Sequence, residues 1–204
     1  MKPTIVTIAG PSCSGKTTLA RGLAARLGED ETCVVPLDAY YRELSSMPLE
    51  ARAHRNFDEP AAFDWPLFEA HVEALAQGSG VDMPVYDFAI HTRHPETVRV
   101  EAHRFIIVEG LLALWSECVR ALSTLRVYVD LLEAACLERR VHRDTAERGR
   151  TLESVRTQFE DTVAPMAERH VAPTRQFAEV VVRGDMPVEE LIREVLARLS
   201  FKSN

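Results

Sequence analysis

Short apolar runs alternate with longer amphipathic segments along this chain. The runs that predict buried strands, because they are short and rich in β-branched residues, are residues 4–9, 33–37, 105–108, 127–131 and 180–182. The segments with apolar side chains at helical spacing are residues 16–27, 66–77, 133–148, 152–170 and 188–199. Strands that alternate with helices predict an α/β fold, in which helices cover both faces of a parallel sheet.

Two stretches lack this regular pattern. Residues 42–65 are polar and irregular, and residues 81–99 predict loop and short-strand structure. The 204 residues and 46% hydrophobic content fit one globular domain spanning residues 1–204.

Charge and cysteine usage narrow the function classes. A net charge of -7 argues against a general surface for nucleic acid or anionic membrane. No apolar stretch approaches the roughly 20 residues of a membrane span, and residues 5–9 are too short for the core of a signal peptide. The cysteines are far apart and form no C-x-x-C pair, which is typical of reduced thiols in a cytoplasmic protein.

Residues 10–17 match the phosphate-loop pattern G-x-x-x-x-G-K-[ST], between a predicted strand and a predicted helix. Backbone N–H groups and the helix dipole then favour an anion. The Lys16 ammonium is expected at the β- and γ-phosphates, and the Thr17 hydroxyl at Mg²⁺. The predicted phosphate-binding residues are Gly10, Pro11, Ser12, Cys13, Ser14, Gly15, Lys16, Thr17 and Thr18. The alternative, a glycine turn before an ordinary helix, leaves the full motif unexplained. The motif predicts nucleoside triphosphate binding without choosing between a kinase, a GTPase and an ATPase motor.

Two carboxylates stand at the carboxyl ends of predicted strands, where ligands bind in parallel sheets. Asp38 is the candidate base for an acceptor hydroxyl; the alternative is a helix-capping or turn aspartate. Glu109 ends a wholly apolar strand, where a carboxylate is costly unless it meets a cation. We therefore expect Glu109 to be a Mg²⁺ ligand, against the alternative of a surface glutamate.

Further motifs occur in a fixed order. They are residues 38–41, 56–64, 84–88, 91–93, 96–100, 107–110, 139–144, 147–150, 173–174 and 177–178. With the phosphate loop, these stretches make the chain resemble the uridine–cytidine kinase family of P-loop kinases, from about residue 5 to 184. Cys13 is a small departure, since family members usually have glycine or alanine there.

The resemblance implies a three-layer P-loop NTPase fold with a nucleoside-binding insertion (residues 42–100) and an arginine-rich lid (residues 139–158). It implies Mg²⁺-dependent transfer of the γ-phosphoryl of ATP or GTP to the 5′-hydroxyl of uridine or cytidine, giving UMP or CMP. It also implies a cytoplasmic homo-oligomer, such as a tetramer, that binds neither nucleic acid nor membrane.

The resemblance also assigns roles to residues. Asp38 and Lys16 are catalytic, and Asp38 joins Thr17 and Glu109 as a candidate Mg²⁺ contact. Asp58 is implied to hold both ribose hydroxyls, which suits a carboxylate with paired acceptors. The remaining expected nucleoside contacts are Tyr41, Phe57, Tyr86, Phe88, His91, Arg140, Arg150 and Gln158. Without the resemblance, core packing is the better interpretation of these aromatic residues, and an ordinary loop histidine that of His91, so base recognition rests mainly on the family likeness.

The lid segment concentrates arginines in an acidic chain. Ion pairs at i,i+4 are available, Arg140 with Asp144 and Arg143 with Glu147, as in an ordinary solvated helix. However, Arg139 repels Arg143, and Gly149 interrupts the helix. We therefore expect a mobile lid whose arginines close on the triphosphate. The resemblance implies that Arg143 and Arg148 lie near the phosphates and Arg140 near the ribose.

Two alternatives stay open at this point. A phosphoribulokinase would need extra basic residues for its phosphorylated acceptor, and residues 56–91 instead supply aromatics and acids, with His71, Arg52 and Arg55 at the margins. A non-catalytic nucleotide-binding module would be favoured by loss of Asp38, Lys16 or Glu109, and all three are present.

Overall fold

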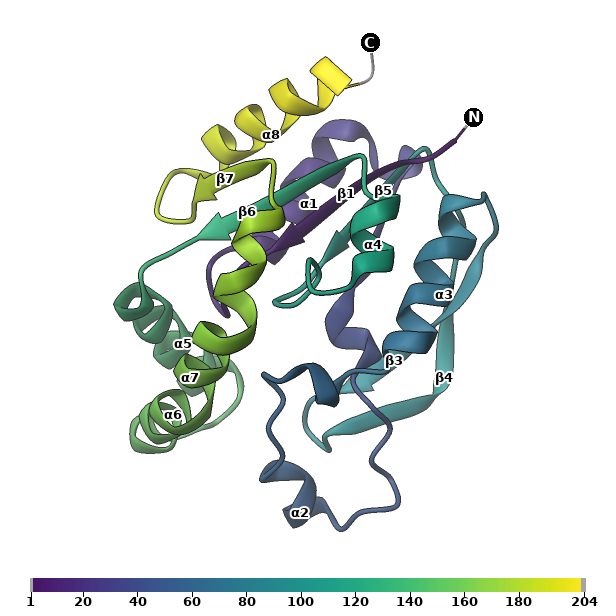
Figure 1. The fold of residues 1–204 in the computed structure, drawn as a ribbon. Coiled ribbons are helices and arrows are strands. Elements are labelled where there is room, and N and C mark those ends of the chain that lie inside the picture. Colours follow the sequence, from purple (N-terminus) through teal and green to yellow (C-terminus); the bar gives the residue numbers. More distant parts are fainter. Residues whose placement is uncertain (1, 203–204) are drawn as a thin grey trace.

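The computed structural model describes residues 2–202. Its centre is a five-stranded sheet in the order β2-β5-β1-β6-β7 (Figure 1). The strands are β1 (Thr4–Ala9), β2 (Thr32–Pro36), β5 (Phe105–Glu109), β6 (Leu125–Asp130) and β7 (Val180–Arg183). Every pairing between neighbours is parallel, so the predicted parallel sheet is confirmed.

Helices cover both faces of this sheet. Alternate side chains of β1 point to opposite faces: Val6 and Ile8 pack into one apolar cluster, and Ile5 and Ala9 into another. The first cluster lies under α1 (Lys16–Leu27) and α8 (Val188–Lys202). The second lies under α3 (Trp65–Ala76) and α4 (Glu117–Leu122). The three-layer α/β prediction is therefore confirmed.

Local sequence explains where the helices begin and end. α1 follows Gly15 and stops at Gly28, and both glycines have the positive φ angles that favour glycine (104° and 102°). The Asp64 carboxylate caps α3 by accepting from the Leu67 N–H at 3.3 Å. α4 was not predicted, because six residues are too few to show a helical period.

Residues 42–100 contain α2 (Leu49–Ala53) and α3, then a hairpin of β3 (Val81–Asp87) and β4 (Thr92–Val100). The hairpin is more regular than the loop and short strands predicted for residues 81–99. Most of β4 is exposed, so its side chains show little alternation of apolar and polar residues. Pro84 and Pro95 weaken the strand pattern further, because proline is rare inside sheets.

The predicted lid segment (residues 139–158) covers most of α5 (Glu133–Glu147) and all of α6 (Leu152–Gln158), which meet at a corner containing Gly149. The single helix predicted for residues 152–170 is instead interrupted by π-helical turns at Phe159–Val163 and Ala167–Val171, on either side of α7 (Ala164–Met166). Pro165, the second residue after the first π turn, has no N–H to continue an α-helical ladder, which explains a local change of helical period.

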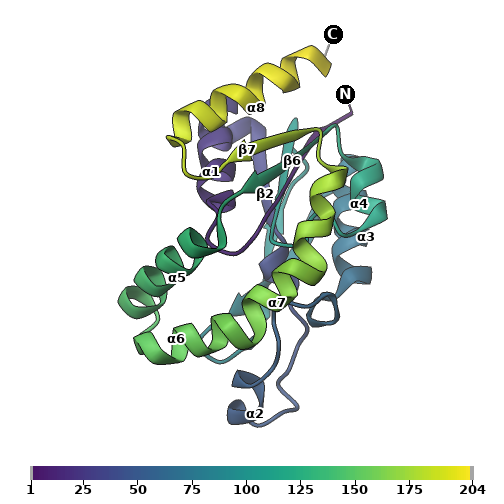
Figure 2. The same cartoon turned by 60° about the vertical axis from the view of Figure 1, so that its left-hand side comes forward.

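Figures 1 and 2 show that the α5–α6 corner and α2 project from the same end of the molecule. None of the helices within residues 2–202 is long and apolar enough to span a bilayer.

Candidate functional site

The phosphate loop runs from the end of β1 to the start of α1 against neighbouring backbone. A Cβ on Gly10 would lie 2.3 Å from the Val129 carbonyl oxygen, and a Cβ on Gly184 would lie 2.2 Å from the Ser14 carbonyl oxygen. Glycine is therefore required at both positions for the loop to seat on the sheet edge. Cys13 adopts a left-handed φ of 64°, and the buried Ser14 hydroxyl has no hydrogen-bond partner among residues 2–202.

Two arginines of α5, Arg139 and Arg140, donate hydrogen bonds to this loop. Arg139 donates from Nη2 to the Gly184 carbonyl (2.9 Å) and from Nη1 to the Cys13 carbonyl (3.4 Å). Arg140 donates from Nη1 to the Ser12 hydroxyl at 3.2 Å. The lid helix is thus connected directly to the loop that is predicted to bind phosphate.

The carboxyl ends of β1, β2 and β5 bring Thr17, Asp38 and Glu109 to one edge of the sheet. Glu109 lies opposite Ile8 of β1 and Pro36 of β2 in the strand register. The Thr17 hydroxyl, in the first turn of α1, donates to Glu109 Oε1 at 3.0 Å. Thr18 follows on the exposed side of that turn.

Lys16 also interacts electrostatically with these carboxylates. Lys16 is buried, and its Nζ donates to the Pro11 carbonyl at 2.7 Å. Burial lowers the pKa of Lys16, and the charges of Glu109 and Asp38 oppose that change. Burial raises the pKa of Asp38, and the nearby Lys16 charge opposes the rise. Glu109 behaves in the same way, because burial raises its pKa and Lys16 lowers it.

The oxygen donors of Thr17, Glu109 and Asp38 suit Mg²⁺, which substrate phosphates help to bind. They suit less well a metal ion that protein side chains hold alone. No three His, Cys, Asp or Glu side chains within residues 2–202 are grouped to hold a metal ion. Mg²⁺ typically uses one or two carboxylates together with substrate phosphates and water. The Thr17–Glu109 pair beside the phosphate loop matches that pattern, and Asp38 adds a carboxylate nearby.

Aromatic side chains from three segments of the insertion gather around Tyr41. Its ring stacks on Phe63 at 4.4 Å between centroids, and contacts Phe57 at 5.4 Å and Tyr86 at 5.0 Å. His91 stacks on Phe57 at 5.3 Å with an interplanar angle of 18°. The structure therefore brings together the aromatic residues that the sequence analysis expected around a nucleoside.

Phe88 completes this aromatic group from the tip of the hairpin. Its ring lies 5.2 Å from Tyr86, it is 47% exposed, and the Arg148 guanidinium lies 5.5 Å above it. Burial lowers the pKa of His91, and the charges of Arg150 and Arg148 lower it further. The insertion and the predicted lid segment therefore approach each other at His91 and Phe88, and these effects favour the neutral form of the His91 imidazole.

Asp58 is a buried carboxylate next to these rings. It is 9% exposed, and its side chain makes no hydrogen bond or ion pair with any residue in the described range 2–202. Burial raises the pKa of Asp58, Arg140 lowers it, and Asp38 raises it. Burial raises the pKa of the Tyr41 hydroxyl, and the charges of Asp38 and Asp58 raise it further, so the two carboxylates and the aromatic group share one site.

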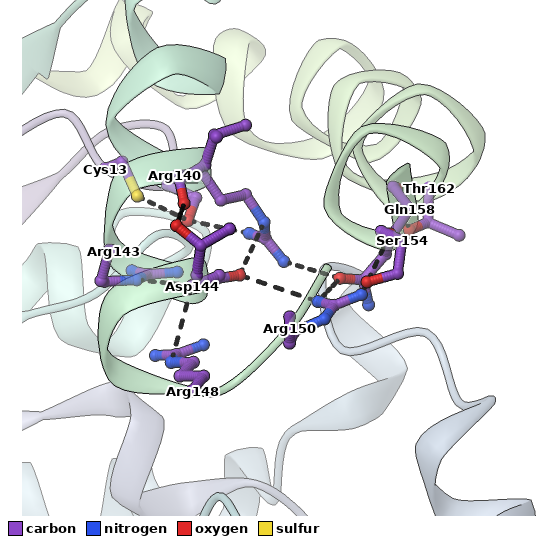
Figure 3. A network of polar contacts seen from close by, with 12 residues as sticks. Cys13, Arg140, Arg143, Asp144, Arg148, Arg150, Ser154, Gln158 and Thr162 are labelled. Carbon is purple, nitrogen blue, oxygen red and sulfur yellow. Dashed lines mark hydrogen bonds and ion pairs between the residues drawn. The ribbon is translucent and has the colours of Figure 1, made fainter. Parts of the chain in front are cut away.

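The lid arginines converge on Asp144 (Figure 3). The Arg143 side chain hydrogen-bonds to this carboxylate and not to Glu147, with which the sequence offered an i,i+4 pair. The Gln158 amide oxygen accepts from both Arg140 and Arg150. From the sequence, Asp144 was expected only to form an ordinary helical ion pair. Its position among five arginines between residues 139 and 150 was the signal that could have shown a larger role.

Comparisons with known proteins agree with this geometry. The family model described as "Phosphoribulokinase / Uridine kinase family" matches residues 5–190. The chain is 43% identical to a uridine kinase of Halobacterium salinarum over 175 residues, which are 86% of this chain and 77% of that protein. It is 41% identical to a uridine kinase of Chloroflexus aurantiacus over 197 residues, covering 97% and 94% of the two chains.

Solved structures show the same fold at lower identity. A possible uridine kinase from Bacillus stearothermophilus aligns with a TM-score of 0.63 and 21% identity, over 89% of each chain. Phosphoribulokinase from Rhodobacter spheroides aligns with a TM-score of 0.68 and 16% identity, over 89% of this chain and 70% of that one. The match to the family model and the identity to these relatives, over most of the chain, show that this chain is a member of the phosphoribulokinase/uridine kinase family.

Proposed function

We propose that this chain is a uridine/cytidine kinase that transfers the γ-phosphoryl of ATP or GTP to the nucleoside 5′-hydroxyl, giving UMP or CMP. The observation that carries the proposal is the buried Asp58, whose side chain has no partner within residues 2–202, beside the Tyr41 aromatic group, together with Asp38, whose charge acts on both Asp58 and Lys16 of the phosphate loop. An acceptor with a flat ring and a cis-diol satisfies both features. The uridine kinases of Halobacterium salinarum and Chloroflexus aurantiacus support the same choice.

Each of these residues has a separate role in phosphoryl transfer. Asp38 accepts the proton of the 5′-hydroxyl, and Lys16 meets the charge of the transferring group. Asp58 accepts hydrogen bonds from both ribose hydroxyls and so fixes the distance of the 5′-oxygen from the phosphate loop. Phe57, Tyr86 and Phe88 cover the base and exclude water.

Thr17 and Glu109, with Asp38 nearby, are the residues that would hold Mg²⁺. When bound, Mg²⁺ neutralises charge on the β- and γ-phosphate oxygens. The Thr17–Glu109 hydrogen bond keeps the glutamate oriented toward the first turn of α1, where those phosphates are expected.

A phosphorylated acceptor, as in phosphoribulokinase, fits less well. The Arg52 guanidinium donates to the carbonyls of Met47, Ile90 and Ser45 at 2.8–3.0 Å. His71 Nδ1 is paired with the Tyr40 hydroxyl at 3.1 Å. These two basic side chains are therefore hydrogen-bonded to other groups of the protein, and they do not form a binding site for a second phosphate.

The test is a coupled assay of ADP formation with uridine, cytidine, ribulose 5-phosphate and pantothenate as separate acceptors, in the presence of ATP and Mg²⁺. We expect turnover with the two pyrimidine nucleosides and none with the other acceptors. Turnover of ribulose 5-phosphate without turnover of uridine would contradict the proposal, and acceptor-independent ADP formation would favour an ATPase.

Three further expectations stay predictions: the cytoplasmic location, the homo-oligomeric assembly and the choice between ATP and GTP as donor.

A further inference from the structure

Arg93, on β4, hydrogen-bonds to the segment that carries Asp38. Its guanidinium donates from Nε to the Tyr41 carbonyl (2.7 Å), from Nη2 to the Tyr40 carbonyl (3.2 Å) and from Nη1 to Asp64 Oδ2 (3.2 Å). The side chain is only 14% exposed. A planar guanidinium presents its donors as a rigid fork, so these three acceptors fix its orientation as well as its position.

The two carbonyls lie at the end of the short turn that places the candidate base. Asp38 belongs to a 3₁₀ turn (Leu37–Tyr40) directly after β2, whose pairing with β5 holds the start of the turn. The last carbonyls of a helical turn have no partner inside it. Here the Tyr40 carbonyl accepts from the Asp64 N–H (2.9 Å) as well as from Arg93. The backbone that carries the candidate base is therefore held at both ends.

The same part of β4 leads to the residue that is expected at the base of the nucleoside. Thr92, next to Arg93, is buried, and its hydroxyl accepts from the Leu44 N–H at 2.9 Å. His91 directly precedes these two residues. Residues 92 and 93 therefore connect the tip of the hairpin to the segment that follows Asp38, through side chains that are mostly or fully buried.

We propose that Arg93 is a positioning residue that fixes Asp38 relative to the nucleoside site. This inference rests on the function proposed above. Asp38 can take a proton only from a hydroxyl within hydrogen-bond reach, and a displacement of about 1 Å can cost about a hundredfold in rate. Arg93 ties the turn that carries Asp38 to the strand that leads to His91. A nucleoside whose base lies at His91 then has its 5′-oxygen at a fixed distance from the carboxylate.

The test is a double-mutant cycle on kcat for uridine, at saturating ATP and Mg²⁺. Arg93→Met keeps an unbranched stem and removes all three donors, and we expect kcat to fall by about tenfold to a hundredfold while KM for ATP is unchanged. In the Asp38→Asn background the base is already lost, so the same change should lower kcat by less than about threefold. The matched control is Arg99→Met, the same change on the same strand, at an exposed arginine that pairs with Glu101 and Asp82; its kcat should match that of the parent protein.

Each outcome bears on a separate claim. A kcat within about twofold of the parent value in Arg93→Met would overturn the inference. Equal fold losses in the two backgrounds would also overturn it, because Arg93 would then support the fold and not Asp38 in particular. An unchanged kcat in Asp38→Asn would remove the candidate base and this inference with it. Absence of uridine turnover in the parent protein would contradict the proposed function instead.

A second variant keeps the test decisive if circular dichroism shows that Arg93→Met is unfolded. Arg93→Lys keeps the positive charge beside Asp64, but a single ammonium has no planar fork to span the two carbonyls as well. It is measured in the same cycle with the same expectation, and a kcat equal to that of the parent protein would overturn the inference.

Discussion

The proposed contact between Asp58 and the ribose predicts strong discrimination against a missing hydroxyl. The carboxylate is 9% exposed and makes no hydrogen bond or ion pair within residues 2–202, so its oxygens are available to accept from substrate hydroxyls. With 2′-deoxyuridine, one acceptor of a desolvated charged group stays unpaired. A lost hydrogen bond to a charged group costs about 1.5–3 kcal/mol, which corresponds to about 10- to 150-fold in kcat/KM.

The assay compares kcat/KM for uridine and 2′-deoxyuridine in the parent protein and in two variants. In Asp58→Asn, uridine should be used poorly and the preference for uridine over 2′-deoxyuridine should shrink, because the charged acceptor is gone. Asp82→Asn is the matched control: it makes the same charge change in the same insertion, at an exposed residue whose one ion pair within residues 2–202 is with the exposed Arg99. Equal use of both nucleosides by the parent protein, or a full preference in Asp58→Asn, would refute the role of Asp58.

Three further predictions follow from the same site. Lys16→Ala should lower kcat by about a hundredfold or more, because a preorganised charge on the transferring group is lost; near-normal turnover in a folded variant would contradict the phosphate-loop assignment. Asp38 acts as a base only when ionised, and burial raises its pKa, so kcat/KM should fall with acid at a pH above 3.8, the ordinary aspartate value; Asp38→Asn should cost about a hundredfold in kcat. Uridine and cytidine should differ by less than about 2 kcal/mol in kcat/KM, because the neutral His91 presents either a donor or an acceptor nitrogen to the base; efficient use of adenosine would argue against this pocket.

The sequence by itself determined the sheet and the position of the catalytic edge. Each predicted strand run overlaps a strand of the observed sheet, because a strand buried on both faces must be apolar along its whole length. The phosphate loop, Asp38 and Glu109 follow such runs directly, and the carboxyl ends of parallel strands meet at one edge. Local pattern and one topological rule were therefore sufficient to bring these groups together.

Where the pattern of apolar and polar residues was weak, the tertiary structure decided which secondary structure forms. The hairpin of β3 and β4 depends on pairing between two strands, and the exposed side chains of β4 carry no periodic signal for it. The π turns beside α7 depend on Pro165 and on the burial of Phe159 and Val163. A pattern of apolar residues at helical spacing does not show such a local change of helix type.

The partners of the lid arginines were also decided only in three dimensions. An i,i+4 ion pair on an exposed helix is worth about 0.3–0.5 kcal/mol, so sequence spacing alone hardly distinguishes Asp144 from Glu147 as a partner for Arg143. Burial separates them, because Asp144 is 0% exposed and must be compensated, whereas Glu147 is solvated. Arg140 similarly reaches Ser12, 128 residues away along the chain, a contact that depends on how α5 packs beside the phosphate loop.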